Sequence, residues 1–232
     1  MDRIGRSADR PSELIATVMH TSPSLPRGLW DISQVLRPAL PVWPGDTQFA
    51  AAQTWAMVQG SAVNVSAFTL SSHSGAHADA PLHYDAGGVG IDAVALETYL
   101  GPCLVVDARA AGAVLEPRHL PSLSGVTRIL FRTYHAFPHD NWTERWTAVA
   151  AETIAALAAA GVVLIGIDSP SLDPQDSKTM DAHHAVAAAD MRILEGLVLD
   201  AVPPGWYELI ALPLRIAGAD AAPVRAVLRE LP

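Results

Sequence analysis

The segment His73-Ser-Gly-Ala-His77-Ala-Asp79-Ala-Pro-Leu-His83 places three imidazoles and one carboxylate within eleven residues. Neutral imidazole nitrogen and carboxylate oxygen are ligands that a divalent metal such as zinc takes in a catalytic site. All four groups stand at odd positions, so an extended backbone would direct them to one side. A lone histidine is usually structural or simply exposed, but four such groups around a glycine and a proline indicate metal binding.

The spacing within the segment leaves its local geometry open. A fully extended chain would hold the Cα atoms of His73 and His77 roughly 13 Å apart, which is too far for easy sharing of one ion. Gly75 permits a bend that other residues resist, and a single helical turn would also bring residues i and i+4 together. Either geometry yields a set of ligands made of His73, His77 and Asp79, with His83 left over.

The composition of the whole chain fits one globular domain. It has 232 residues, of which 50% are hydrophobic and 17% are charged, enough for one substantial core. The formal net charge of −9 and the lack of a Lys/Arg cluster argue against a nucleic-acid-binding protein. Cys103 is the single cysteine, so an internal disulfide is excluded and a structural zinc site with cysteine ligands is not expected. A chain without a disulfide suits the cytoplasm.

The first 28 residues differ from the rest of the chain. They carry four arginines, three prolines and several serines, without the unbroken apolar core of a secretory signal. We expect residues 1–28 to form a loosely ordered extension, residues 29–232 to form the single domain, and Met19 to be an alternative start. No run of about 20 apolar residues suggests a membrane span.

Strand signals outnumber helix signals and the two are interspersed, which predicts an α/β or mixed α+β domain with a central mixed sheet and covering helices. Expected strands cover 29–33, 63–70, 102–107, 128–133, 162–168, 193–200 and 207–212. Expected helices cover 151–160, 180–189 and 223–231, the last with a proline at its start. The segment 85–91 reads as a glycine-rich turn rather than a phosphate loop, because no Lys-Ser/Thr follows.

A second group of polar residues follows the apolar run that ends at Asp168. His183 lies in this region, and adjacent His184 would point about 100° away on a helix, so at most one of them faces a site. Glu195 lies in an otherwise apolar run, where a carboxylate is costly to bury unless it is paired or bound to metal; an exposed edge-strand position is the alternative.

Together these residues suggest two ions. His73, His77 and Asp79 would hold the first ion, and Asp79, His183 and Glu195 the second, with the Asp79 carboxylate bridging. A pair of ions of this kind can activate a water molecule near neutral pH. His83 would then be free for general acid–base work, since its ordinary pKa is close to the working range.

The pattern His-x-Gly-x-His-x-Asp-x-Pro-x-His resembles the signature of the cyclase-like metal-dependent hydrolases, and the chain is most similar to their bacterial kynurenine formamidase (arylformamidase) branch. The similarity runs from about Leu29 to the C-terminus. Its supporting stretches are 30–33, 41–46, 62–65, 100–103, 166–174, 177–183, 193–196 and 207–213. Ser72, Ser74 and Ser169 depart from the residues common in the family, without replacing a ligand.

This resemblance implies a cyclase-like fold, with its sheet forming a partial barrel, and hydrolysis of N-formyl-L-kynurenine to L-kynurenine and formate in tryptophan degradation. It implies two Zn²⁺ ions per subunit, a homodimer, and the metal ligands His73, His77, Asp79, His183 and Glu195. It further implies that His83 donates and accepts protons and that Trp43 contacts the substrate. Without the resemblance, Trp43 could equally be an ordinary core residue.

Three alternatives remain at this stage. A related amide or cyclic-imide hydrolase, similar to isatin hydrolase and using manganese or zinc, would share the same ligands. A serine hydrolase would need a Gly-x-Ser-x-Gly elbow, which the sequence lacks. A non-catalytic metal-binding protein would leave His83 unused.

Overall fold

The computed structural model describes residues 28–231. The expected N-terminal extension, apart from Gly28, lies outside these residues, as does the alternative start at Met19. The two α-helices are α1 (Ala151–Ala159) and α2 (Asp181–Ala188). The strands are β1 (Leu29–Asp31), β2 (Ala50–Trp55), β3 (Val65–Thr69), β4 (His77–Asp79), β5 (Leu100–Asp107), β6 (Val114–Leu115), β7 (Arg128–Arg132), β8 (Ala148–Val149), β9 (Leu164–Ile167), β10 (Arg192–Glu195), β11 (Gly205–Ile210), β12 (Ala221–Pro223) and β13 (Val227–Glu230).

Short 3₁₀ turns complete the architecture: η1 (Met57–Gln59), η2 (Pro81–His83), η3 (Ile91–Ala93), η4 (Leu96–Tyr99), η5 (Arg109–Ala111) and η6 (Pro117–His119). Among the described residues, none of the helices has the length and apolarity needed to cross a membrane.

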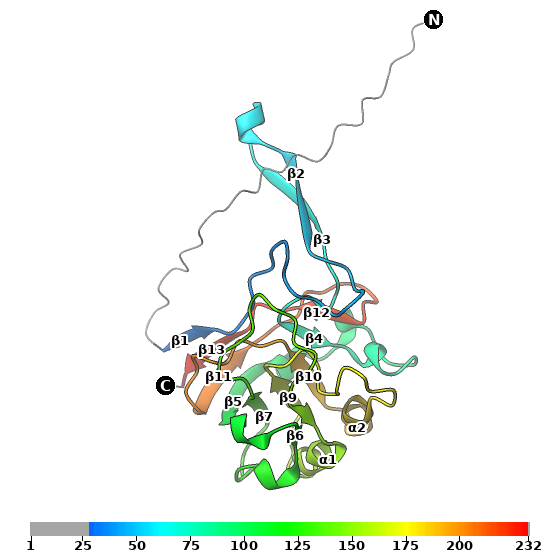
Figure 1. Cartoon of the computed structure of the whole chain (residues 1–232), viewed down its shortest axis with the longest axis vertical. Helices are drawn as coiled ribbons and strands as arrows, with labels where there is room; N and C mark the ends of the chain where they lie inside the picture. The colour runs from blue at the N-terminus through cyan, green and yellow to red at the C-terminus, as the bar shows by residue number, and fades with distance from the viewer. Residues whose placement is uncertain (1–27, 232) are drawn as a thin grey trace, which may run out of the picture.

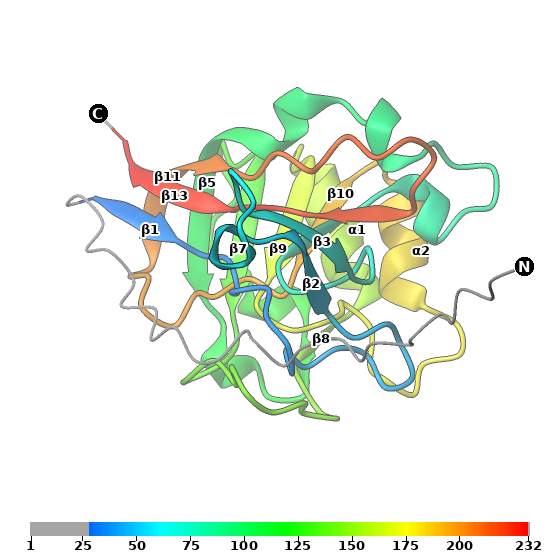
Figure 2. The same cartoon turned by 90° about the horizontal axis from the view of Figure 1, so that it is seen from above.

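A mixed nine-stranded sheet forms the body of the protein, in the order β1-β13-β11-β5-β7-β9-β10-β4-β12. Its centre, β5-β7-β9-β10, is parallel, and the strands on both sides pair antiparallel. Helices α1 and α2 lie beside the central strands (Figures 1 and 2). This arrangement confirms the expected mixed α+β class.

Both faces of the central strands are buried, because successive side chains enter different cores. On β7, Leu130 joins one cluster, whereas Ile129 and Phe131 join the other. The second cluster includes Ile154 and Leu157 from α1 together with residues of α2. Burial on both faces explains why the strands at the centre of the sheet are continuous apolar runs in the sequence.

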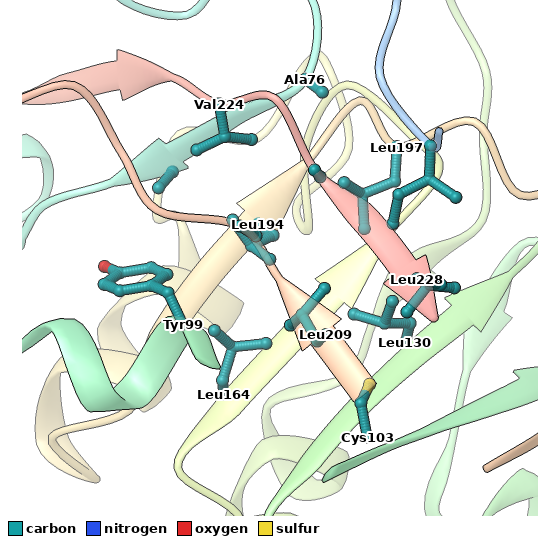
Figure 3. Close-up of a cluster of buried hydrophobic side chains, with 14 of the residues drawn as sticks. Ala76, Tyr99, Cys103, Leu130, Leu164, Leu194, Leu197, Leu209, Val224 and Leu228 are labelled. Carbon is teal, nitrogen blue, oxygen red and sulfur yellow. The ribbon is translucent and has the colours of Figure 1, made fainter. Parts of the chain in front are cut away.

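The first core cluster lies within the curve of the sheet itself (Figure 3). Its buried members come from strands across the sheet and from the segments that connect them, and none comes from α1 or α2; the strand members include Cys103, Leu164, Leu194, Leu209 and Leu228. A sheet that covers its own inner face in this way forms a partial barrel, as the resemblance implied.

Most predicted elements are confirmed, but several differ, and the short strands β6 and β8 were not predicted. The predicted helix over 223–231 is wrong: residues 221–223 and 227–230 are strands. Burial there alternates, with Val224, Ala226 and Leu228 inside and Arg225 and Arg229 exposed, which is the period of a strand. The strand predicted over 193–200 ends at Glu195. The strand β2 was not predicted at all.

Strands β2 and β3 form a separate hairpin that projects away from the sheet (Figure 1). Its exposed side chains include Trp55, Val58 and Phe68. Although β3 was predicted, it belongs to this hairpin and reaches the histidine segment only after a turn.

Candidate metal centre

The histidine segment combines a strand with a glycine bend. His77 and Asp79 lie on β4, where alternate residues share one side of the strand. Gly75 adopts a φ of 65°, and an added Cβ there would lie 2.9 Å from a Leu36 side-chain carbon. The bend brings His73 back beside Asp79, so the glycine bend and not the helical turn is the geometry observed.

The second half of the site reaches the first through strand register. β10 pairs antiparallel with β4, and Glu195 is opposite His77. Gly196 follows with a φ of 65°, and the strand ends there. His183 lies in the first turn of α2 and is buried, whereas His184 is exposed, in agreement with the prediction that at most one of them faces the site.

The Asp79 carboxylate lies at the centre of the cluster and is fully buried. Its Oδ1 lies 3.1 Å from His73 Nδ1 and 3.5 Å from His77 Nε2, and its Oδ2 lies 3.5 Å from His183 Nε2. Glu195 completes the cluster, with Oε2 3.5 Å from His77 Nε2 and Oε1 3.6 Å from His183 Nε2. The structure thus brings all five expected ligands together.

Each of the three imidazoles donates its outer N–H to an oxygen acceptor. His77 Nδ1 donates to the Gly75 carbonyl at 2.9 Å, His73 Nε2 to Asp220 at 3.0 Å, and His183 Nδ1 to Asp173 at 2.6 Å. Such hydrogen bonds fix the tautomer and leave the other nitrogen of each ring free toward Asp79, as in metal-binding histidines.

The electrostatics of the cluster favour a cation. Burial alone would lower the pKa of His73, but Asp79 and Asp220 outweigh it and raise the pKa to about 9. Burial likewise opposes the charge on His183, yet Asp173 and Asp79 raise its pKa to about 10. The negative charge of the buried carboxylates keeps these rings protonated. The same charge would attract a metal ion that replaces the protons.

The buried polar atoms also fit a metal. Among the described residues, His77 Nε2 and both Asp79 carboxylate oxygens are buried without a hydrogen-bond partner, a costly arrangement unless something else satisfies them. Two ligand groups with closely spaced atoms occur, His73–Asp79–His83 and His77–Asp79–Glu195. Asp79 belongs to both, as a bridging carboxylate would.

This grouping differs from the predicted assignment to two ions in three respects: His83 joins His73 and Asp79, His77 joins Glu195, and His183 belongs to neither group. The rings of His73 and His83 are 4.3 Å apart between centroids. The His83 side chain is 30% exposed, and burial lowers its pKa. A deprotonated ring at the edge of the site is able to accept a proton near neutral pH.

A pocket of about 330 Å³ opens onto the cluster. His73, His77, His83, His183 and Glu195 line one part of it. Its other walls include the aromatic residues Trp43, Tyr134, Phe137 and Trp142. The pocket therefore joins a polar cluster with ligand character to an aromatic wall.

Three tryptophans pack edge to face at this wall. Trp43 lies 5.6 Å from Trp142 and 5.8 Å from Trp146 between ring centroids. Trp43 was identified from the sequence, whereas Trp142 and Trp146 were not. These two tryptophans lie within five residues of each other in a polar segment, and that spacing could have identified them. Asp173, ten residues before His183, and Asp220, 147 residues after His73, were also not singled out from the sequence.

Comparison with known proteins places this chain in a known family. The family model described as "Putative cyclase" matches residues 30–174. The chain belongs to this Cyclase family, and the resemblance stated from the histidine segment is thereby confirmed.

Its curated relatives include kynurenine formamidases. The one from Erythrobacter litoralis is 56% identical over 89% of this chain and 95% of its own length. The one from Maricaulis maris is 61% identical over 88% of this chain and 99% of its own length. The predicted similarity to this branch of the family is therefore also confirmed.

Solved structures agree on the fold. A potential metal-dependent hydrolase with cyclase activity has a TM-score of 0.76 and 27% identity, covering 88% of this chain and 98% of its own. Isatin hydrolase A from Labrenzia aggregata has a TM-score of 0.75 and 23% identity, covering 87% and 93%. At that identity the second likeness supports the cyclase-like fold alone.

Proposed function

We propose that this protein hydrolyses N-formyl-L-kynurenine to L-kynurenine and formate, a step of tryptophan degradation. The observation that carries the proposal is the pocket, which joins an aromatic wall to a cluster of imidazoles and carboxylates. A formylated aniline has matching parts, an aromatic ring and a hydrolysable carbonyl. The high identity to kynurenine formamidases supports this substrate over other amides.

The proposed metal ligands are His73, His77, Asp79, His183 and Glu195, with Asp79 bridging two Zn²⁺ ions. Their support is the convergence of ligand atoms on Asp79 and the free nitrogen on each imidazole. When bound, two zinc ions would polarise the formyl carbonyl and supply a reactive water at neutral pH.

The chain's own residues would bind the substrate and move protons. Trp43, 36% exposed at the pocket, would stack on the aniline ring. His83 would accept a proton from the attacking water and deliver it to the departing aryl amine. Its position beside His73 and His183 supports this role.

Substrate comparison tests the proposal. We expect the purified protein to turn over N-formyl-L-kynurenine far faster than isatin, followed by ultraviolet absorbance under identical conditions. Faster hydrolysis of isatin would instead make the protein a cyclic-imide hydrolase of the same family.

We also propose a homodimer built through the β2–β3 hairpin, in a cytoplasmic protein with one domain over residues 29–232. The hairpin exposes Val58 to 93% and Phe68 to 64%, and an isolated two-stranded hairpin is at best marginally stable. A second copy of the chain covering this surface would bury those side chains. The buried, unpaired Cys103 is compatible with the cytoplasm.

Sedimentation equilibrium tests the dimer. The double variant Val58→Glu/Phe68→Glu should sediment as a monomer, whereas Leu96→Glu, which places a charge on another exposed apolar position outside the hairpin, should remain dimeric. A double variant that stays dimeric would exclude the hairpin as the interface.

A further inference from the structure

We propose that Asp173 is a positioning residue that orients the His183 ring for metal binding and connects that ring to the aromatic wall of the pocket. The inference rests on the proposed role of His183 as a metal ligand and deepens it. Asp173 lies in the loop between β9 and α2 and is 3% exposed.

The first support is the contact between the two side chains. His183 Nδ1 donates to Asp173 Oδ2 at 2.6 Å, and both side chains are buried. This bond places a hydrogen on Nδ1 and leaves Nε2, which points toward Asp79 and Glu195, as the atom that would bind a metal. A carboxylate partner also makes the ring a more basic ligand than a neutral acceptor does.

The second support is that the Asp173 carboxylate is itself held at the start of α2. The backbone N–H groups of Ala182 and His183 donate to its two oxygens at 3.0 and 3.1 Å. The backbone and the ring of His183 thus share one acceptor, Oδ2. Rotation of the ring would break a hydrogen bond that the helix start already anchors, so the ring orientation is fixed before any ion binds.

The third support comes from the other side of Asp173. Its backbone carbonyl accepts the Trp146 indole N–H at 3.0 Å, and Trp146 packs against Trp43 and Trp142. One residue therefore contacts both the metal cluster and the aromatic wall.

The neighbouring ligand histidines have weaker anchors. His77 donates to the neutral Gly75 carbonyl, and His73 donates to Asp220, whose side chain is 44% exposed. Asp173 combines charge with burial, which strengthens its hydrogen bond. The loss of Asp173 should consequently be felt at the ion held by His183 more than at the other ion.

A pair of variants separates positioning from simple helix capping. Asp173→Asn keeps the size of the side chain and one acceptor oxygen for the α2 backbone, but it removes the carboxylate from the His183 ring. Asp176→Asn is the matched control. Asp176 is exposed in the same loop, and its substitution removes the same charge. Asp173→Ser, which keeps a hydroxyl oxygen but no charge, serves if the Asn variant does not fold.

The measurement is Zn²⁺ affinity of the full chain after metal removal, by competition with a chromophoric chelator, together with thermal unfolding of the metal-free protein. Asp173→Asn should weaken one zinc equivalent by about 10- to 100-fold, with a melting temperature near that of the wild type. Asp176→Asn should change neither quantity.

The outcomes distinguish the two proposals. If Asp173→Asn binds both zinc equivalents as tightly as the wild type, Asp173 is only a cap and the inference is overturned while the proposed function stands. If the wild type itself binds no zinc, the proposed metal site fails and the inference fails with it.

Discussion

At the residue scale, Asp79 explains why the cluster exists at all. Burying a carboxylate without partners is costly, and both Asp79 oxygens lack hydrogen bonds within the described residues. Surrounding imidazoles lower the Asp79 pKa against the opposing effect of burial. The residue is therefore kept as an anion in the interior, which is useful chiefly if a cation binds there.

His83 provides a test at this scale, because it is close enough to be a ligand and is assigned a proton-transfer role. His83→Ala should lower kcat by about 10²- to 10⁴-fold, the usual contribution of general acid–base catalysis, while two zinc equivalents remain bound. Metal analysis alongside steady-state kinetics checks this. Loss of a zinc equivalent in the variant would identify His83 as a ligand.

Zinc loading should release protons. In the metal-free protein, His73 and His183 have pKa values of about 9 and 10, so both are protonated at pH 7. Because a ligating nitrogen must lose its proton, loading should release about two protons per subunit at pH 7, and zinc affinity should rise with pH. Calorimetry in buffers of different ionisation enthalpy measures this number, and release of none would contradict the pKa assignment.

At the scale of elements, the site depends on where β10 ends. Gly196 follows Glu195, and an added Cβ there would lie 2.4 Å from the Gly75 carbonyl oxygen that accepts the His77 N–H. The bends at Gly75 and Gly196 are in contact, and this contact keeps the proposed ligands of β4 beside the one of β10. Two segments that are distant in the sequence therefore each need a glycine at the point where they meet.

Gly196→Ala should destabilise the protein by about 2–4 kcal/mol, combining left-handed backbone strain with overpacking, and should weaken zinc binding by displacing the acceptor of His77. Gly161→Ala is the control, since Gly161 also has a positive φ but open space around it. It should cost only about 1 kcal/mol and leave zinc affinity unchanged. Urea unfolding and zinc titration measure both, and equal effects of the two substitutions would argue against the junction.

The five proposed ligands could be singled out from the sequence because their chemistry is visible in residue type, and the structure brings their side chains together. The α1 helix and the strands β5, β7, β9 and β11 were also predictable from continuous local patterns. By contrast, β12 and β13 are specified by pairing with distant strands and looked helical beside Pro223. Asp173 and Asp220 escaped notice for the same reason, since their roles depend on contacts that only the folded chain creates.

At the scale of the whole molecule, the curled sheet encloses a core, while its strands β4 and β10 carry three of the proposed ligands, His77, Asp79 and Glu195. Cys103 belongs to that core (Figure 3) and is fully buried. Burial raises the pKa of its thiol, so the reactive thiolate is suppressed.

The native protein should therefore react with a thiol-specific chromophoric reagent at least about 100-fold more slowly than the unfolded chain, since thiolate and access are both required. Labelling with and without denaturant gives the ratio. Rapid labelling of the folded protein would show that the core around Cys103 opens readily.

If metal ions held around Asp79 drive formamide hydrolysis, the reaction depends on their presence. The most direct test is ultraviolet measurement of N-formyl-L-kynurenine hydrolysis before chelation, after complete metal removal, and after return of two equivalents of Zn²⁺. We predict that turnover disappears with the metal and returns with zinc. Undiminished turnover by fully metal-free protein would contradict the account.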